Sequence, residues 1–215
     1  MRVIAIDGPA GSGKSTVARA VASKLGLQYL DTGAMYRAVA FAALKRGVDP
    51  ADAEVVAQIA LQVDLEIADR IIVDGSDATA EIRSPEVTRA VSVVAANPAV
   101  LTEMVARQRE WVAAHGGGVV EGRDIGSVVF PDAELKVYLT ADDAERASRR
   151  TREMGESHFK EVAADMARRD HVDSTRATSP LSVAPDAVVI DTTGVDIEEV
   201  VHDVLELAEV RQQRG

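Results

Sequence analysis

The clearest chemical pattern in the chain is Gly8-x-x-x-x-Gly13-Lys14-Ser15, which follows directly on an apolar run at residues 3–6. Glycines at this spacing let backbone N–H groups turn inward and form a nest for an anion. A lysine at the end of such a loop reaches phosphate oxygens, and the hydroxyl beside it is a ligand for Mg²⁺. The pattern predicts a loop that binds ATP or GTP, with Ser15 as the metal ligand.

An amphipathic helix is predicted directly after this loop. Apolar residues recur at helical spacing from Val17 to Leu25, and Gly26 is a typical helix stop. The helix begins near Lys14, so the positive end of its dipole faces the same phosphates. The residues expected to contact the nucleotide are Gly8, Pro9, Ala10, Gly11, Ser12, Gly13, Lys14, Ser15 and Thr16.

Charged side chains also follow two other predicted strands. Arg37 lies one turn into the helix after Thr32, and Arg123 and Asp124 follow an apolar run at residues 118–121. Ligands of open parallel sheets bind at the carboxyl ends of the strands. Position alone leaves open that Arg37 is a surface helix arginine and that Arg123 and Asp124 belong to a loop ion pair.

A third group of charges comes later in the chain. Arg169, Asp173 and Arg176 are spaced i, i+4 and i+7, so they share one face if their helix runs through residue 176. Spacing alone favours an exposed stripe of ion pairs there. A further basic helix carries Arg146, Arg149, Arg150 and Arg152. It is interpreted as a lid over about residues 146–168 whose arginines close over the ATP phosphates, or else as a solvated basic face.

Alternating apolar runs and helical patterns predict the elements that position these groups. Such alternation is typical of an α/β fold with a parallel sheet and crossover helices. Five strands are expected at 2–7, 27–30, 118–121, 134–140 and 186–191. Helices are expected at 14–25, 33–46, 51–61, 84–95, 98–114, 142–153, 157–171 and 196–211. Period-two alternation at about 63–83 predicts a small antiparallel β insertion on a single domain that covers residues 1–215.

The composition of the chain indicates which binding partners and which cellular compartment to expect. The 215 residues carry a net charge of −11 and no cysteine, and no apolar run approaches the roughly 18 residues of a membrane span. We therefore expect no nucleic-acid partner and no membrane insertion. The chain starts with a strand, which leaves no room for a signal peptide, and the absence of cysteine suits a reducing compartment. A cytoplasmic monomer is expected.

The rest of the chain distinguishes among classes of phosphate-loop protein. A GTPase carries an Asn-Lys-x-Asp motif, but the one asparagine, Asn97, is followed by proline. No signature of a transporter ATPase is present, and the apparent lack of an acidic pair at strand ends disfavours a hydrolytic motor. A small kinase with a substrate insertion and an arginine-rich lid remains.

At five segments the chain resembles the bacterial cytidylate kinases, over essentially its whole length. The segments are IDGPAGSGKST at 6–16, DTGAMYR at 31–37, EIR at 81–83, EGRDIGSVVFPDA at 121–133 and RDHVDSTR at 169–176. The resemblance implies transfer of the ATP γ-phosphate to CMP or dCMP, with Mg²⁺ as cofactor. The alternative is a kinase of the same class that acts on UMP or another small metabolite.

The resemblance also implies roles for individual residues. Lys14, Arg123 and Arg169 would be catalytic, and Arg149 of the lid would join the ATP site. The residues implied for the acceptor nucleotide are Thr32, Tyr36, Arg37, Ser92, Arg123, Asp124, Arg169, Asp173 and Arg176.

Among these, the resemblance gives the acceptor phosphate to arginines, the ribose hydroxyls to Asp173, and the cytosine base to Asp124 and Ser92. The β insertion would lie near the acceptor. The chain departs from the family at Leu101, where relatives carry an arginine that helps to hold the base, and Arg107 or Arg109 would have to compensate.

Overall fold

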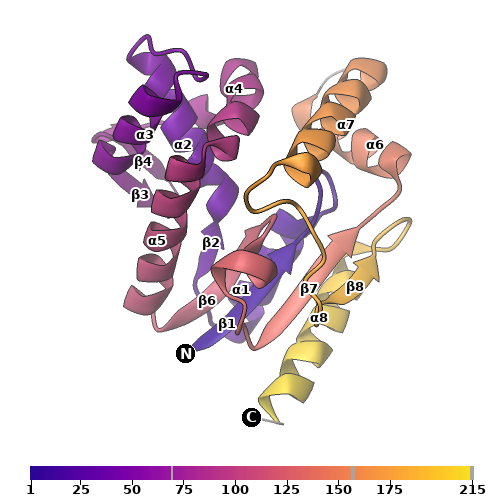
Figure 1. Ribbon diagram of the computed structural model, residues 1–215. Coiled ribbons are helices and arrows are strands. Elements are labelled where there is room, and N and C mark those ends of the chain that lie inside the picture. The colour runs from indigo at the N-terminus through magenta and orange to yellow at the C-terminus, as the bar shows by residue number, and fades with distance from the viewer. Residues whose placement is uncertain (69, 156–157, 214–215) are drawn as a thin grey trace. The chain divides into compact units, whose positions relative to one another are not determined.

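β1, the strand Arg2–Asp7, lies in the middle of a five-stranded parallel sheet. The strand order is β2-β6-β1-β7-β8, with β2 at Tyr29–Asp31, β6 at Gly117–Gly122, β7 at Leu135–Thr140 and β8 at Val188–Asp191 (Figure 1). This computed structural model describes residues 1–68, 70–155 and 158–213, without the side chain of Met154. The predicted five-stranded parallel sheet is confirmed.

The chain divides into two compact units, each of which is described by itself. Unit 1 comprises Met1–Tyr29 and Val112–Gly215, and unit 2 is Leu30–Trp111. The helices of unit 1 are α1 (Lys14–Leu25), the π-helical turn η2 (Ile125–Val129), α6 (Asp143–Met154), α7 (Phe159–Thr175) and α8 (Ile197–Gln212). The chain runs from unit 2 back into unit 1 through α5 (Pro98–Ala114).

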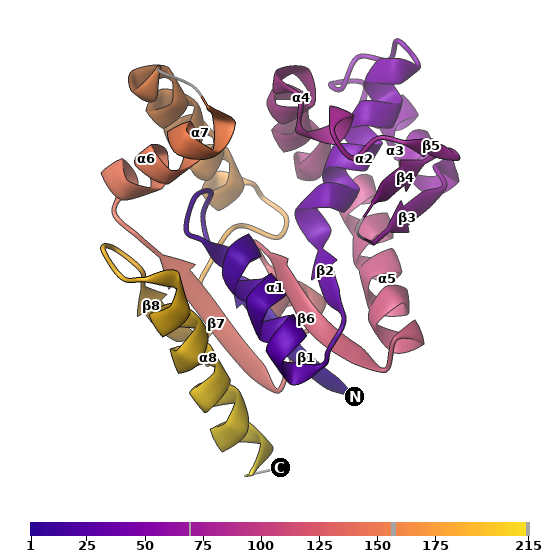
Figure 2. The ribbon, with the colours of Figure 1, turned by 180° about the vertical axis from the view of Figure 1, so that it is seen from behind.

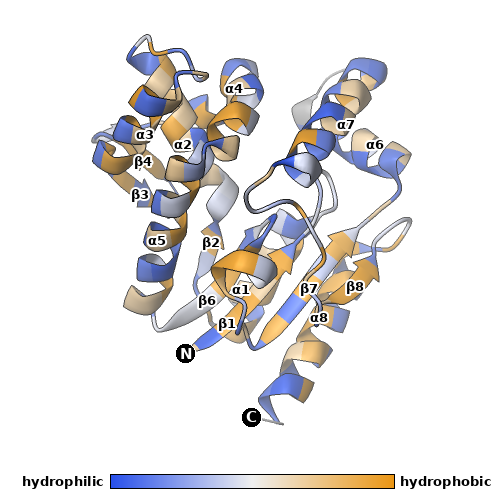
Figure 3. Cartoon of the chain, in the orientation of Figure 1, coloured by the Kyte–Doolittle hydropathy of each residue, from blue (hydrophilic) through white to orange (hydrophobic). Residues whose placement is uncertain are grey.

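The core of unit 1 lies between the sheet and two helices. Ile4 and Ile6 of β1 point to one face, as alternate residues of a strand must, and they pack with Val17 and Val21 of α1. α8 adds Val204 to the same cluster. Figure 2 shows α1 and α8 on this face, and Figure 1 shows η2 on the opposite one. Figure 3 shows that hydrophobic residues gather along the strands and that hydrophilic residues predominate on α6.

Unit 2 is built from helices around a small sheet. Its helices are α2 (Thr32–Lys45), α3 (Ala53–Gln62), the 3₁₀ turn η1 (Glu81–Arg83), α4 (Pro85–Ala96) and most of α5. Its strands β3 (Leu65–Ile67), β4 (Ile71–Val73) and β5 (Ser76–Asp77) pair antiparallel in that order. The antiparallel insertion predicted at 63–83 is therefore confirmed, within residues 65–77.

Element boundaries differ modestly from those predicted. The strand expected at 27–30 lies at Tyr29–Asp31, and the one expected at 186–191 begins at Val188. The helix expected at 157–171 begins at Phe159 and continues to Thr175. The start predicted at residue 157 lies outside the described residues. The extension brings Asp173 onto the helix, which matters for the site.

Candidate active site

The loop between β1 and α1 has the backbone geometry of an anion nest. Gly13 caps α1 in the left-handed conformation, with φ 86°. Gly8 lies so close to β7 that a Cβ at this position would be 2.2 Å from the Leu139 carbonyl oxygen. Any side chain there would displace the loop, so both glycines are required by the local structure.

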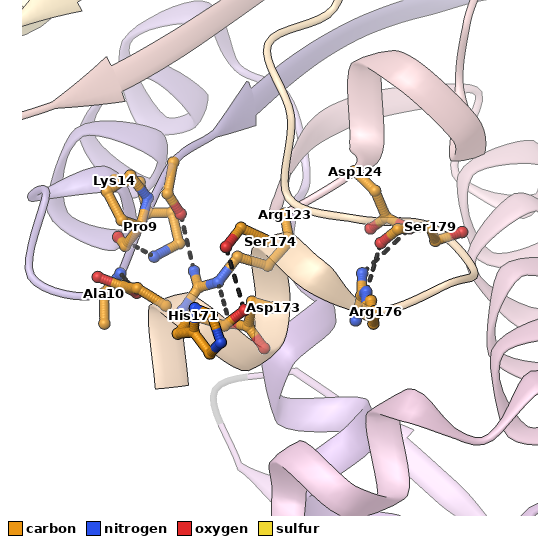
Figure 4. Close-up of polar contacts among 12 residues, drawn as sticks. Pro9, Ala10, Lys14, Arg123, Asp124, His171, Asp173, Ser174, Arg176 and Ser179 are labelled. Atoms are coloured by element: carbon orange, nitrogen blue, oxygen red, sulfur yellow. Dashed lines mark hydrogen bonds and ion pairs between the residues drawn. The ribbon is translucent and has the colours of Figure 1, made fainter. Parts of the chain in front are cut away.

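Both predicted phosphate- and metal-binding side chains lie at this loop. The Lys14 ammonium donates to the Pro9 carbonyl oxygen at 3.1 Å, which folds the side chain over the loop (Figure 4). The Ser15 hydroxyl donates to Glu121 Oε2 at 2.8 Å. Glu121 is 2% exposed at the carboxyl-terminal part of β6. A carboxylate therefore faces the predicted metal ligand.

Two acids do end neighbouring strands, and the expectation that no such pair exists is wrong. Asp7 is the last residue of β1, and Glu121 is the next to last of β6, the strand paired with it. The two residues are 114 positions apart in the sequence, and the parallel register sets Glu121 beside Ile6 and Asp7 beside Gly122. A glutamate that closes a buried apolar run was the available signal.

Asp7 holds the turn that follows β6. Its carboxylate accepts hydrogen bonds from Ile125 N at 2.9 Å and from Gly126 N at 2.8 Å. Burial raises the pKa of Asp7 from 3.8 to about 6, although these two N–H donors lower it. Asp7 thus connects the base of the nucleotide loop to the segment that carries Arg123 and Asp124.

Arg123 connects the nucleotide loop with α7. Its Nε donates to Asp173 Oδ2 at 2.9 Å, and its Nη1 donates to the Gly8 carbonyl oxygen at 2.8 Å (Figure 4). Burial disfavours the guanidinium, but Asp173, helped by Asp170 and Glu121, outweighs that cost and raises the pKa of Arg123 above its usual value. The loop ion pair left open by sequence is therefore a long-range pair that ties α7 to the loop.

Arg169 brings a second guanidinium to this cluster. Its Nε is buried and has no hydrogen-bond partner among the described residues. Burial, followed by the neighbouring Arg123, lowers the pKa of Arg169. Two half-buried guanidinium groups repel each other, so an anion bound beside them would relieve both the repulsion and the missing hydrogen bond.

Arg176 does not continue the helical face of Arg169 and Asp173. α7 ends at Thr175, and Arg176 has extended backbone angles of φ −62° and ψ 140°. Its guanidinium turns towards Asp124, with Nη2 3.6 Å from Oδ2, and its Nε donates to the Ser179 carbonyl oxygen (Figure 4). The side chains of Arg176 and Asp124 are 7% and 6% exposed. The stripe of exposed ion pairs favoured by spacing is therefore wrong.

Asp124 is a buried acceptor with unused capacity. Its Oδ2 accepts no hydrogen bond from the described residues. Burial raises the pKa of Asp124, while Arg176 opposes that rise. The carboxyl group is therefore able to accept a hydrogen bond from a ligand.

Two of the four predicted lid arginines, Arg146 and Arg149, are held by partners outside their own helix. Arg146 is buried, donates to the Ala10 carbonyl oxygen at 2.8 Å, and also bonds to Asp170 of α7. Asp170 in turn accepts from Ala10 N at 3.3 Å. Arg149 donates to the Thr192 hydroxyl at 2.9 Å and to its carbonyl oxygen at 2.6 Å. α6 and α7 are thus both bonded to the loop, which a solvated basic face would not be.

The remaining predicted site residues belong to unit 2. Thr32 and Tyr36 are buried in α2, and Ser92 is half-buried in α4. Arg37 donates to the Thr88 hydroxyl at 3.0 Å and to the Ile82 carbonyl oxygen at 3.4 Å. These contacts fix Arg37 against η1 and α4, so it is not a free surface arginine.

The position at which the chain departs from the resemblance is buried. Leu101 is 2% exposed in α5. Arg107 donates to the Val63 and Leu61 carbonyl oxygens at 2.8 and 3.0 Å and pairs with Glu103. Arg107 is thereby committed to unit 2's own backbone.

The described residues contain no cluster of three or more His, Cys, Asp or Glu that could hold a metal ion. The Ser15 hydroxyl and Glu121 are nevertheless oxygen donors of the kind that Mg²⁺ prefers when substrate phosphates supply further ligands. The residues present therefore fit this ion. No described helix is both long and apolar enough to cross a membrane.

The fold and the loop define a kinase of the P-loop class. Two solved structures share the fold: an uncharacterized protein from Eubacterium ventriosum ATCC 27560 and a gluconokinase from Sinorhizobium meliloti 1021. Their TM-scores are 0.53 and 0.51, at 12% and 15% identity. The first alignment covers 97% of this chain and 99% of the other, and the second covers 99% and 94%.

The sequence narrows the class to one family. The cytidylate kinase family model matches residues 4–210. Cytidylate kinases from Desulfitobacterium hafniense and Mycolicibacterium paratuberculosis are 49% and 47% identical, over 99% and 98% of this chain and 94% and 96% of theirs. The chain belongs to the cytidylate kinase family, as its motifs predict, and is a nucleoside monophosphate kinase.

Proposed function

We propose that this protein transfers the γ-phosphate of ATP to CMP or dCMP through the cluster of charges around its nucleotide loop. An oxygen of the acceptor phosphate attacks the γ-phosphorus, the bond to the β–γ bridging oxygen breaks, and ADP leaves. The attacking oxygen is already anionic, so no strong general base is needed. Catalysis then depends on positioning and on neutralising two polyanions.

The observation that carries the proposal is the unpartnered guanidinium nitrogen of Arg169. A half-buried cation next to another cation is unfavourable unless an anion completes the group. A phosphate suits this position because guanidinium groups bind it with two hydrogen bonds. We assign the acceptor phosphate to Arg123, Arg169 and Arg176.

The donor phosphates are assigned to the loop and Lys14. Residues 8–16 of the loop would surround the ATP phosphates, and Arg149 of α6 would contact the same phosphates. Mg²⁺, held by Ser15 and Glu121, would neutralise charge on the donor phosphates. Lid residues 146–168 would exclude water from the reacting groups. Residues 156 and 157 of that lid lie outside the described residues.

The rest of the acceptor is assigned by chemistry. The unused Oδ2 of Asp124 suits the cytosine amino group, which is a donor. Asp173 would accept from the ribose hydroxyls. Thr32, Tyr36, Arg37 and Ser92 are also assigned to the acceptor nucleotide, and the β insertion is proposed to serve its binding. We further propose a cytoplasmic monomer that binds no nucleic acid, in keeping with the absence of cysteine and the charge of −11.

ADP release measured with CMP, dCMP, UMP, AMP and GMP tests the proposal. CMP and dCMP should give the highest kcat/KM. Lys14→Ala should lower kcat by about 10³-fold, because it removes one charged donor from the developing phosphoryl charge. Lys24→Ala, at the far end of α1, is the matched control and should leave turnover unchanged. Preference for UMP would favour the alternative acceptor, and turnover of AMP or GMP but not CMP would overturn the proposal.

A further inference from the structure

A tyrosine outside all the motifs holds the acid that faces Ser15. The Tyr29 hydroxyl donates to Glu121 Oε1, while the Ser15 hydroxyl donates to Oε2. The two oxygens of one buried carboxylate are thus fixed by two different hydroxyl groups. Tyr29 begins β2, and the residue before it, Gln28, accepts a hydrogen bond from Val119 N of β6 at 2.8 Å. The backbone therefore anchors Tyr29 beside the strand that carries Glu121.

The ring of Tyr29 is also held from α1. The guanidinium carbon of Arg19 lies 4.9 Å from the ring centroid, within the range of a cation–π contact. α1 is the helix that begins with Lys14 and Ser15. The chain of contacts Arg19–Tyr29–Glu121–Ser15 therefore starts and ends on the same helix.

We infer that Tyr29 is a positioning residue for Glu121 and thereby sets the affinity of the nucleotide loop for Mg²⁺. Without the tyrosine hydroxyl, Oε1 would lose a donor in a buried place, and the carboxylate would turn to find another. Oε2 would then leave Ser15. Groups that orient metal ligands in this way change metal affinity without touching the metal. The inference rests on the proposed assignment of Mg²⁺ to this loop.

Tyr29→Phe tests the inference, because it keeps the ring for Arg19 and removes only the hydroxyl. Calorimetry would measure ADP binding without Mg²⁺, and then the Mg²⁺ concentration that half-saturates the ADP-bound protein. We expect ADP affinity without the metal to be unchanged and the half-saturating Mg²⁺ concentration to rise about tenfold. Turnover of CMP should fall at low Mg²⁺ and recover at saturating Mg²⁺.

Thr102→Val serves as the control. The Thr102 hydroxyl donates to the Pro98 carbonyl oxygen of its own helix, α5, at 2.9 Å. It should not change Mg²⁺ dependence. A merely structural role for Tyr29 would shift the unfolding temperature and ADP affinity alike, without separating the two titrations.

The outcomes separate this inference from the proposed function. Equal Mg²⁺ dependence in Tyr29→Phe and the unmodified protein would overturn it, as would ADP binding that Mg²⁺ does not affect in either. An unmodified protein that binds ADP with Mg²⁺ but does not phosphorylate CMP would overturn the proposed acceptor instead. The Tyr29→Phe titration would still decide the inference.

Discussion

The two units differ in whether their charged side chains are buried. Within the described residues, every buried charged side chain lies in unit 1: Asp7, Glu121, Asp124, Lys136, Arg146 and Asp173. The buried polar residues of unit 2, Thr32 and Gln108, are uncharged. Its Arg46–Asp74 ion pair is exposed, with side chains 37% and 39% accessible, while Arg107 and Glu103 are 24% and 23% accessible.

Burying a charge is unfavourable unless it is paired, so the difference has a cost in stability. Unit 1 accepts that cost where the nucleotide loop meets α7, because a phosphate must find its cations already in place. Unit 2 keeps its charges in solvent, where they add little to the free energy of unfolding. The location of buried charged residues therefore indicates the candidate active site better than the total number of charged residues does.

Asp173→Asn is the strongest test of the difference between the two units, because it removes a buried charge of unit 1. The substitution leaves Arg123 and Arg169 buried without their acidic neighbour, so the free energy of unfolding should fall by about 3 kcal/mol. Urea denaturation would measure it. A change below 1 kcal/mol would mean that the pair contributes no more than a surface pair.

Arg169→Ala should separate activity from stability. We expect kcat/KM for CMP to fall about 100-fold, because a buried guanidinium that binds phosphate is lost. The unfolding temperature should stay equal or rise, since an unpartnered buried nitrogen and a like-charge contact are removed. Arg168→Ala, next to it and 61% exposed, should change neither. A loss of stability in Arg169→Ala would contradict our interpretation of the cluster.

Asp7 should give unit 1 a specific pH dependence. Its folded pKa of about 6 lies above the 3.8 of the unfolded chain, so between these values the folded state keeps a proton that the unfolded state releases. The contribution of Asp7 to stability is therefore present below pH 4 and lost as the pH rises through 6. Relative to Asp7→Asn, the native protein should lose on the order of 2 kcal/mol between pH 4.5 and pH 7.

Urea midpoints of Asp7→Asn and the native protein at both pH values would measure this difference. The other titrating groups cancel between the two proteins. A difference that does not vary with pH would show that Asp7 is ionised throughout.

The smallest effect is expected at Asp74→Asn, the counterpart of Asp173→Asn in unit 2. Asparagine tolerates the left-handed backbone of this residue, with φ 49°, so only the charge facing Arg46 changes. Stability should fall by less than about 1 kcal/mol, and less still at high salt. A loss as large as that at Asp173 would remove the contrast between the units.

The sequence predicted the architecture well because its signals are local. Alternation, helical spacing and Gly26 predicted the sheet, α1 and the β insertion, with errors of a few residues at the ends. The cluster of charges was harder. Arg123 meets Asp173 across 50 positions, and no local pattern reports such a pairing.

Two details of the site depend on the chain's path through space. Arg176 leaves the helical face because α7 ends one residue earlier, so spacing alone placed it wrongly. Glu121 lies in one of the matching segments but is given no role from sequence, because its partners Ser15 and Tyr29 are 106 and 92 positions away. The roles of individual residues towards ATP and CMP stay predictions.

The bonds at Ala10 have a mechanical consequence. Ala10 of the glycine loop accepts a hydrogen bond at its carbonyl oxygen from Arg146 of α6 and donates its N–H to Asp170 of α7, and Arg146 and Asp170 also bond to each other. Movement of either helix would therefore displace the backbone that surrounds the donor phosphates, so we expect nucleotide binding and movement of α6 and α7 to be coupled.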